Sequence, residues 1–132
     1  MQPLRIGLAV LMVLHGIAHL PGFANSWRLA TFPDLPYHTT LLGGRLEIGN
    51  AGMRVAGALW LAAALAFCLV GAGAVLQRGG WIGIAMAVAA ASLVLCLLEW
   101  PAARIGVWVN VAILLALVLA QRLHWFASSA AG

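Results

Sequence analysis

Long apolar stretches, separated by short polar or glycine- and proline-containing segments, dominate the chain. They cover about residues 4–23, 46–76, 81–99 and 105–123. Each is close to or above the roughly 20 residues that a helix needs to cross a hydrocarbon core about 30 Å thick. The pattern predicts four transmembrane helices, with breaks at Pro21-Gly22, at Gln77–Gly80 and at Trp100-Pro101.

One connection is long. Residues 24–45, between the first and second predicted helices, hold Pro33, Asp34, Pro36 and His38, and loops of this length are usually functional or disordered. We expect a single domain over residues 1–132. Its fold class would be all-α, an integral membrane up-down bundle of four transmembrane helices with this loop between helices 1 and 2.

Composition supports a membrane protein. Of 132 residues, 64% are hydrophobic and only 8% are charged, and the mean hydropathy is +1.04. Soluble domains carry about 25% charged residues, so the chain lacks the polar surface that a soluble globule needs. We therefore expect the lipid bilayer as its first partner.

The net charge of +4 comes from seven arginines and three acids. The arginines are scattered and form no nucleic-acid-binding patch. Four spans place both termini on one side, and the arginine count is nearly equal on the two sides. We favour cytoplasmic termini because the opposing arginines lie in the long loop or beside acids. Arg5 precedes an apolar run as in a signal peptide, but no A-x-A site follows, so we expect an uncleaved first helix.

The polar residues of the predicted helices gather at one end of the bundle. In an up-down arrangement they all lie on the side of the long loop, and ionisable groups at membrane depth usually point inward and pair. This predicts a ligand-binding polar pocket beneath the loop. Its candidate residues are His15, His19, Glu47, Asn50, Arg54, Glu99, Arg104, Trp108 and Asn110.

A second interpretation stays open for five of these residues. Residues 55–76 alone are long enough to span, which would leave Glu47, Asn50 and Arg54 as ordinary interfacial residues. Glu99 and Arg104 would then be solvated loop charges. His15, His19 and Asn110 lie at least one turn inside any span, so we expect them to face the bundle interior.

The candidate residues also suggest chemistry. His15 and His19 share a helix face and could hold one metal ion, with Glu47 and Glu99 completing the site. We expect no metal, because Glu47 and Glu99 should be engaged by Arg54 and Arg104 or by interfacial water, and a guanidinium would occupy the lone pairs of a carboxylate. For catalysis, Glu47 or Glu99 would be the acid or base and His15 or His19 its partner. Nothing in the sequence names a cofactor.

Small residues recur at every fourth position in three predicted helices. Examples are Ala58, Ala62 and Ala66, followed by Gly83, Ala87 and Ala91. Such spacing lets helix backbones approach closely in lipid. It predicts tight packing within the bundle, or against other chains.

Two short motifs resemble small bacterial four-helix membrane proteins of the DoxX-like kind. One is the His15–Phe23 stretch HGIAHLPGF, and the other is the Arg104–Asn110 stretch RIGVWVN. The resemblance covers the whole helix layout. It implies a multi-pass protein of the bacterial inner membrane, supplies no catalytic residues, and suggests a link to redox or quinone-associated membrane complexes.

Three functions are consistent with these features. The first is binding of an amphipathic, lipidic or quinone-like molecule in the polar end, by the chain alone, as a homo-oligomer or within a larger complex. The second is a membrane-embedded isomerase or hydrolase of an isoprenoid or sterol-like substrate. The third is a purely structural accessory subunit. A cavity opening onto the polar cluster would favour the first two.

Overall fold

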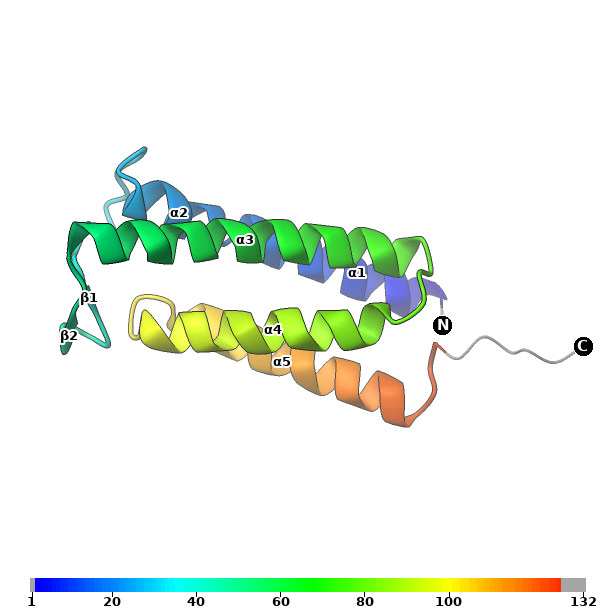
Figure 1. Ribbon diagram of the computed structural model, residues 1–132. Helices are drawn as coiled ribbons and strands as arrows, with labels where there is room; N and C mark the ends of the chain where they lie inside the picture. Colours follow the sequence, from blue (N-terminus) through cyan, green and yellow to red (C-terminus); the bar gives the residue numbers. More distant parts are fainter. Residues whose placement is uncertain (1, 127–132) are drawn as a thin grey trace, which may run out of the picture.

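Four long helical segments run alternately up and down in the computed structural model, which describes residues 2–126 (Figure 1). They are α1 (Gln2–Ile17) continued by α2 (Leu20–Ser26), then α3 (Gly49–Val75), α4 (Trp81–Leu98) and α5 (Arg104–Arg122). All four segments are long and apolar enough to cross a membrane. The helix positions predicted from the sequence are therefore confirmed to within three residues, except in the first segment.

The first segment does not end at Pro21-Gly22 as predicted. It breaks at Ala18-His19 and continues as α2 to Ser26. Pro21 lies in the first turn of α2, and its nitrogen has no hydrogen to donate to the carbonyl one turn earlier. The proline therefore starts a second short helix instead of ending the first, and the whole span covers Gln2–Ser26.

The long connection contains a small hairpin, so the chain is not entirely helical. Strands β1 (Thr40–Leu41) and β2 (Leu46–Glu47) pair antiparallel, with Thr40 opposite Glu47. The turn between them uses positive φ angles at Leu42, Gly43 and Gly44. The helix predicted from residue 46 begins only at Gly49, because Leu46 and Glu47 belong to β2. The Leu42 amide donates to the Leu98 carbonyl at 2.8 Å, which joins the hairpin to the end of α4.

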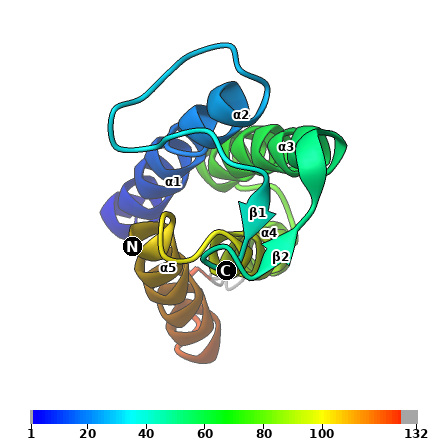
Figure 2. The same ribbon diagram turned by 90° about the vertical axis from the view of Figure 1, so that its left-hand side faces the viewer.

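The bundle consists of two helix pairs. The segment α1–α2 packs mainly on α3, while α5 packs mainly on α4, and α3 contacts α4 between the pairs (Figure 2). The largest buried cluster includes Met12, Phe67, Ile113 and Leu117. At Gly16 the α1 and α3 backbones come so close that a Cβ would lie 2.8 Å from the Ala64 carbonyl oxygen.

The predicted small-residue stripes do not make these contacts. Ala58, Ala62, Gly83 and Ala91 lie exposed on the outside of the bundle. The close approaches occur instead at Gly16, Gly57, Gly71 and Gly106. The exposed stripes therefore do not contribute to packing within the bundle, and their packing against other chains stays a prediction.

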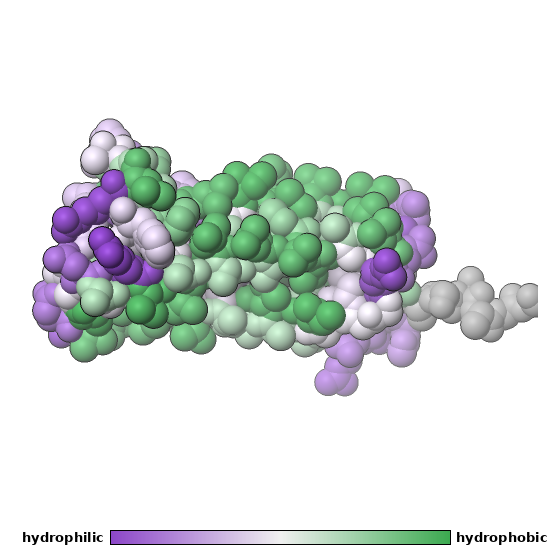
Figure 3. All heavy atoms as spheres, turned by 45° about the horizontal axis from the view of Figure 1, so that its top comes forward, coloured by the Kyte–Doolittle hydropathy of each residue, from purple (hydrophilic) through white to green (hydrophobic). Residues whose placement is uncertain are grey.

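The surface is apolar around the middle and polar at both ends (Figure 3). Large side chains such as Leu69 (73%) and Ile105 (74%) are exposed on this apolar surface. Helix α1 begins and α5 ends at the same end of the bundle, while the long loop covers the other (Figure 1).

Candidate functional site

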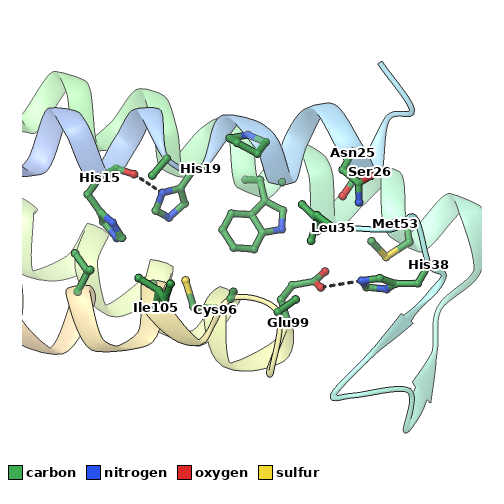
Figure 4. A pocket seen from close by; sticks show the side chains of 18 residues that line it. His15, His19, Asn25, Ser26, Leu35, His38, Met53, Cys96, Glu99 and Ile105 are labelled. Atoms are coloured by element: carbon green, nitrogen blue, oxygen red, sulfur yellow. Dashed lines mark hydrogen bonds and ion pairs between the residues drawn. The ribbon is translucent and has the colours of Figure 1, made fainter. Parts of the chain in front are cut away.

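A cavity of about 280 Å³ lies at the loop end of the bundle. Residues from every helix and from the long loop line it, and it separates the α1–α2 segment from the start of α5 (Figure 4). Its wall is largely apolar, with Met53 and the Trp60 ring from α3 among the lining side chains. Ala18, Ala102 and Ile105 also line it and are themselves exposed. The cavity therefore reaches the protein surface along the seam between the two helix pairs.

Two histidines lie at the deep end of this cavity. His15 comes from the last turn of α1 and His19 from the break before α2, and their rings meet edge to face with centroids 4.7 Å apart. Their exposures are 7% and 2%, and Asn110 of α5 is fully buried beside them. The prediction that these three residues face the interior is confirmed.

A chain of hydrogen bonds with one possible direction holds the deep end together. The Nδ1 atom of His19 lies 2.7 Å from the His15 carbonyl oxygen, which can only accept. Nδ1 of a neutral ring must then carry the proton, so Nε2 accepts from the Ser92 hydroxyl at 2.7 Å. The Ser92 oxygen accepts in turn from the Asn110 amide at 2.9 Å. His19 is thereby satisfied as a neutral ring without any ligand.

Other polar atoms at the cavity have no partner. Among the described residues, His15 Nε2, Asn110 Oδ1 and Glu99 Oε1 are buried, and no partner lies within hydrogen-bonding geometry of any of them, although the side chains of His15 and Asn110 are neighbours. His15 and Glu99 both line the cavity, and Figure 4 shows His15 pointing from α1 across it. Buried polar groups are almost always paired, so His15 Nε2 and Glu99 Oε1 mark places where a ligand or ordered water would bind.

Glu99 marks the outer end of the cavity. It follows α4, is 7% exposed, and its Oε2 lies 3.6 Å from Nε2 of His38 in the long loop. Burial raises the pKa of this carboxyl above its usual value, and the nearby His38 opposes that shift. The predicted pairing of Glu99 with Arg104 is wrong, because the loop supplies His38 instead. Arg104 is exposed and does not line the cavity.

Glu47 is not part of this site. It lies on β2, exposed, and its carboxylate accepts a hydrogen bond from the Gly49 amide at 2.9 Å. Hydrogen bonds from Thr39 and from this amide lower the Glu47 pKa. Glu47 therefore does not belong to the same helix as Asn50 and Arg54, although a helix was predicted from residue 46, because α3 begins only at Gly49.

Three further candidates also lie outside the cavity. Asn50 and Arg54 line a separate hollow where the end of α2 meets the start of α3. Trp108 is 67% exposed on the outer surface of α5 and is not a wall of the cavity. Of the nine predicted residues, the cavity and its hydrogen-bond chain unite His15, His19, Glu99 and Asn110.

Among the residues of the site that the sequence did not identify are His38, Trp60, Ser92 and Cys96. Ser92 carried a usable signal, because a serine in the middle of an apolar helix usually bonds to a neighbouring helix. His38 carried none, since the path of the loop decides which loop side chain reaches the bundle.

A metal site would need more ligands than His15 and His19 provide. Within residues 2–126, no three His, Cys, Asp or Glu side chains lie together as a metal would require. His19 is also engaged through both ring nitrogens. The donors that remain at the cavity suit hydrogen bonding to an organic ligand.

No protein-family model, curated protein or solved structure matches the chain.

Proposed function

We propose that the chain is an integral membrane protein of the bacterial inner membrane that binds the polar head of an amphipathic or lipidic molecule. The four apolar spans would cross the bilayer with both termini on the cytoplasmic side. The cavity at the loop end would be the binding site, either in the chain alone or within a larger membrane complex. The observation that carries this proposal is the pair of unpartnered buried atoms, His15 Nε2 and Glu99 Oε1, at a largely apolar cavity.

The size and position of the cavity favour a head group over a whole lipid. Its volume of about 280 Å³ is at the lower limit of ligand pockets, which run from about 300 to 1,000 Å³. An apolar tail would have to leave through the seam beside Ala18 and Ile105. Both residues belong to apolar spans, so the tail would pass directly into the hydrocarbon.

The donors and acceptors favour an uncharged head. No arginine is among the described residues that line the cavity, so an anion would lack a counter-charge. A neutral imidazole and a carboxyl with a raised pKa can each donate or accept a hydrogen bond. Carbonyl or hydroxyl oxygens on a compact ring, as in a quinone-like molecule, would satisfy both.

Ligand analysis of purified protein tests the proposal. The native chain would be extracted with its surrounding lipid, and bound molecules identified by mass spectrometry. In Ala18→Trp an indole would block the seam, whereas Ala58→Trp adds the same ring to an exposed face away from the cavity. We expect one amphipathic molecule per chain, lost in Ala18→Trp and in His15→Leu but kept in Ala58→Trp. Equal retention in all variants, or no enrichment over bulk lipid, would contradict the proposal.

One contact also favours an enzyme. Glu99 is buried, has a raised pKa and lies 3.6 Å from His38 at the cavity. A carboxyl with a raised pKa beside an imidazole is suited to general acid–base catalysis. An isomerase or hydrolase of an isoprenoid or sterol-like substrate would use Glu99 as its acid or base. Glu47 would have no role, because it does not line the cavity. Conversion of the bound molecule by the native chain, but not by Glu99→Gln, would support this alternative. A purely structural subunit would leave the unpartnered atoms unexplained.

A further inference from the structure

A second, smaller hollow lies where the end of α2 meets the first turns of α3. Its volume is about 120 Å³, and its lining is mostly polar. Two arginines, Arg28 and Arg54, line it together with Trp27, Tyr37 and Asn50. Its chemistry is therefore opposite to that of the larger cavity, which no arginine lines.

The guanidinium of Arg28 is held in place before any ligand binds. Its Nη2 atom donates to Asn50 Oδ1 at 2.9 Å, and its central carbon lies 4.2 Å from the centre of the Tyr37 ring. The Tyr37 hydroxyl donates to the same Asn50 oxygen at 2.6 Å. Arg28 follows α2 with a positive φ of 55°, a conformation in which glycine is usual. The hydrogen bond to Asn50 uses one of the five N–H groups of the Arg28 guanidinium, and the others can donate to a bound acceptor.

Arg54 is the second arginine that lines the same hollow. The Trp27 indole N–H donates to the Arg54 carbonyl at 2.9 Å, which ties the end of α2 to α3 at this point. In the described part of the chain the one ion pair is His38 with Glu99, so no carboxylate lies within 4.0 Å of either arginine. An anion bound in this hollow would be attracted by both arginines.

We propose that this hollow binds a phosphate group. Guanidinium groups match phosphate oxygens in geometry and form charge-assisted hydrogen bonds with them. The hollow follows the Gln2–Ser26 span and lies at the start of the Gly49–Val75 span, the depth at which lipid phosphates lie if these spans cross a bilayer. The phosphate would belong to an anionic lipid head group or to a free phosphate. The site is distinct from the larger cavity, with which it shares only Ser26.

Native mass spectrometry of the full chain in neutral detergent, with phosphatidylglycerol added, tests this site. The Arg28→Gln/Arg54→Gln variant removes both charges, and Arg45→Gln/Arg78→Gln removes two charges that lie outside the hollow. We expect one retained phosphatidylglycerol in the native chain, bound at least about tenfold more weakly in the first variant. The second variant should bind as the native chain does. Equal retention in the two variants would overturn the proposal.

A competition experiment separates the two sources of phosphate. Sodium phosphate that displaces phosphatidylglycerol from the native chain, where sodium chloride of equal ionic strength does not, would identify free phosphate as a ligand. Retention that phosphate does not affect would identify the lipid head group. If the double variant fails to fold, Arg54→Gln alone carries the test, because no hydrogen bond of the Arg54 side chain exists within residues 2–126. Unchanged lipid retention in a folded Arg54→Gln protein would overturn the site.

Discussion

The Nε2 atom of His19 lies 2.7 Å from the Ser92 hydroxyl oxygen, and this contact joins the α1–α2 junction to the middle of α4. Because Asn110 of α5 donates to the same oxygen, one hydroxyl connects three helical segments. All three side chains are buried. An unpaired polar group in such an interior is costly, so the hydroxyl fixes how the two helix pairs lie against each other beneath the cavity.

The first prediction concerns Ser92→Ala. The substitution removes the donor to His19 Nε2 and one acceptor of the Asn110 amide, and leaves both groups buried. We expect the free energy of unfolding to fall by about 1–2 kcal/mol. Unfolding of the purified protein by a denaturing detergent, followed by circular dichroism, would measure this. The double variant Ser92→Ala/Asn110→Ala should lose less stability than the sum of the losses in the two single variants, because both substitutions remove the same hydrogen bond. Full additivity would argue against the chain of bonds.

The second prediction concerns the contact between α1 and α3. A Cβ at Gly16 would lie 2.8 Å from the Ala64 carbonyl oxygen and 2.9 Å from Phe67 Cβ. These atoms cannot rotate away, so Gly16→Ala should destabilise the protein by about 1–3 kcal/mol. Gly7 is the matched control on the same helix, because nothing lies within 4 Å of a Cβ there. Gly7→Ala should be neutral or slightly stabilising. Similar unfolding midpoints for the two variants would contradict the close approach.

Hydrophobic periodicity was enough to locate the helices. The length and spacing of apolar stretches decide which segments can cross a membrane, and α4 and α5 agree with their predicted bounds to within one residue. The sequence failed where a local conformation depends on one backbone group. Pro21 looked like the end of a helix but occupies the first turn of α2, a position where its missing N–H costs nothing.

The site was harder to predict because it depends on tertiary contacts. Depth alone placed His15, His19 and Asn110 correctly, since polar groups deep in an apolar helix must face inward. Glu47 was misplaced because the small hairpin ends the loop three residues further along than expected, at the boundary of β2 and α3. The His38–Glu99 contact was missed because its partners are far apart in the sequence, and the loop that carries His38 has no periodic pattern.

The third prediction is a pH dependence that Glu99 causes. Its folded-state pKa lies above its usual value because the carboxyl is buried. The stability that the protonated form supplies is fully present below the usual pKa and is lost as the pH rises through the folded-state pKa. The native chain should therefore become less stable above about pH 4.5, and Glu99→Gln should lose this part of the dependence. Unfolding midpoints of both proteins between acidic and neutral pH would measure it.

Glu47 provides the opposite control. Hydrogen bonds from Thr39 and the Gly49 amide lower its pKa, so its contribution is present at neutral pH and is lost as the pH falls through the lowered pKa. Glu47→Gln should therefore differ from the native chain most at neutral pH, and least in acid. The same pH profile for both variants would mean that burial does not distinguish the two carboxyls.

The fourth prediction is that deletion of residues 30–40 leaves the helical bundle folded. The helix pairs pack through buried side chains such as Met12, Phe67 and Leu117, which lie outside the loop. The deletion removes Leu35 and His38 from the cavity wall, so binding of any molecule found there should change. Size-exclusion chromatography in detergent would report folding. Loss of the monodisperse species would show that the loop stabilises the bundle itself.

The last prediction uses Cys96 to report access to the cavity. Its side chain lines the cavity but is only 1% exposed, so alkylation by N-ethylmaleimide requires the cavity to open. In a Cys68→Ala background Cys96 is the one remaining thiol. His38→Ala removes the contact of the loop with Glu99 and should speed alkylation, because nothing then holds the loop against that carboxyl. Thr31→Ala changes an exposed residue of the same loop that does not line the cavity, so it should leave the alkylation rate unchanged.

Mass spectrometry of the alkylated chain over time gives the rates for both variants. If His38→Ala and Thr31→Ala react alike, the reagent enters through the seam beside Ala18, and the loop does not control access.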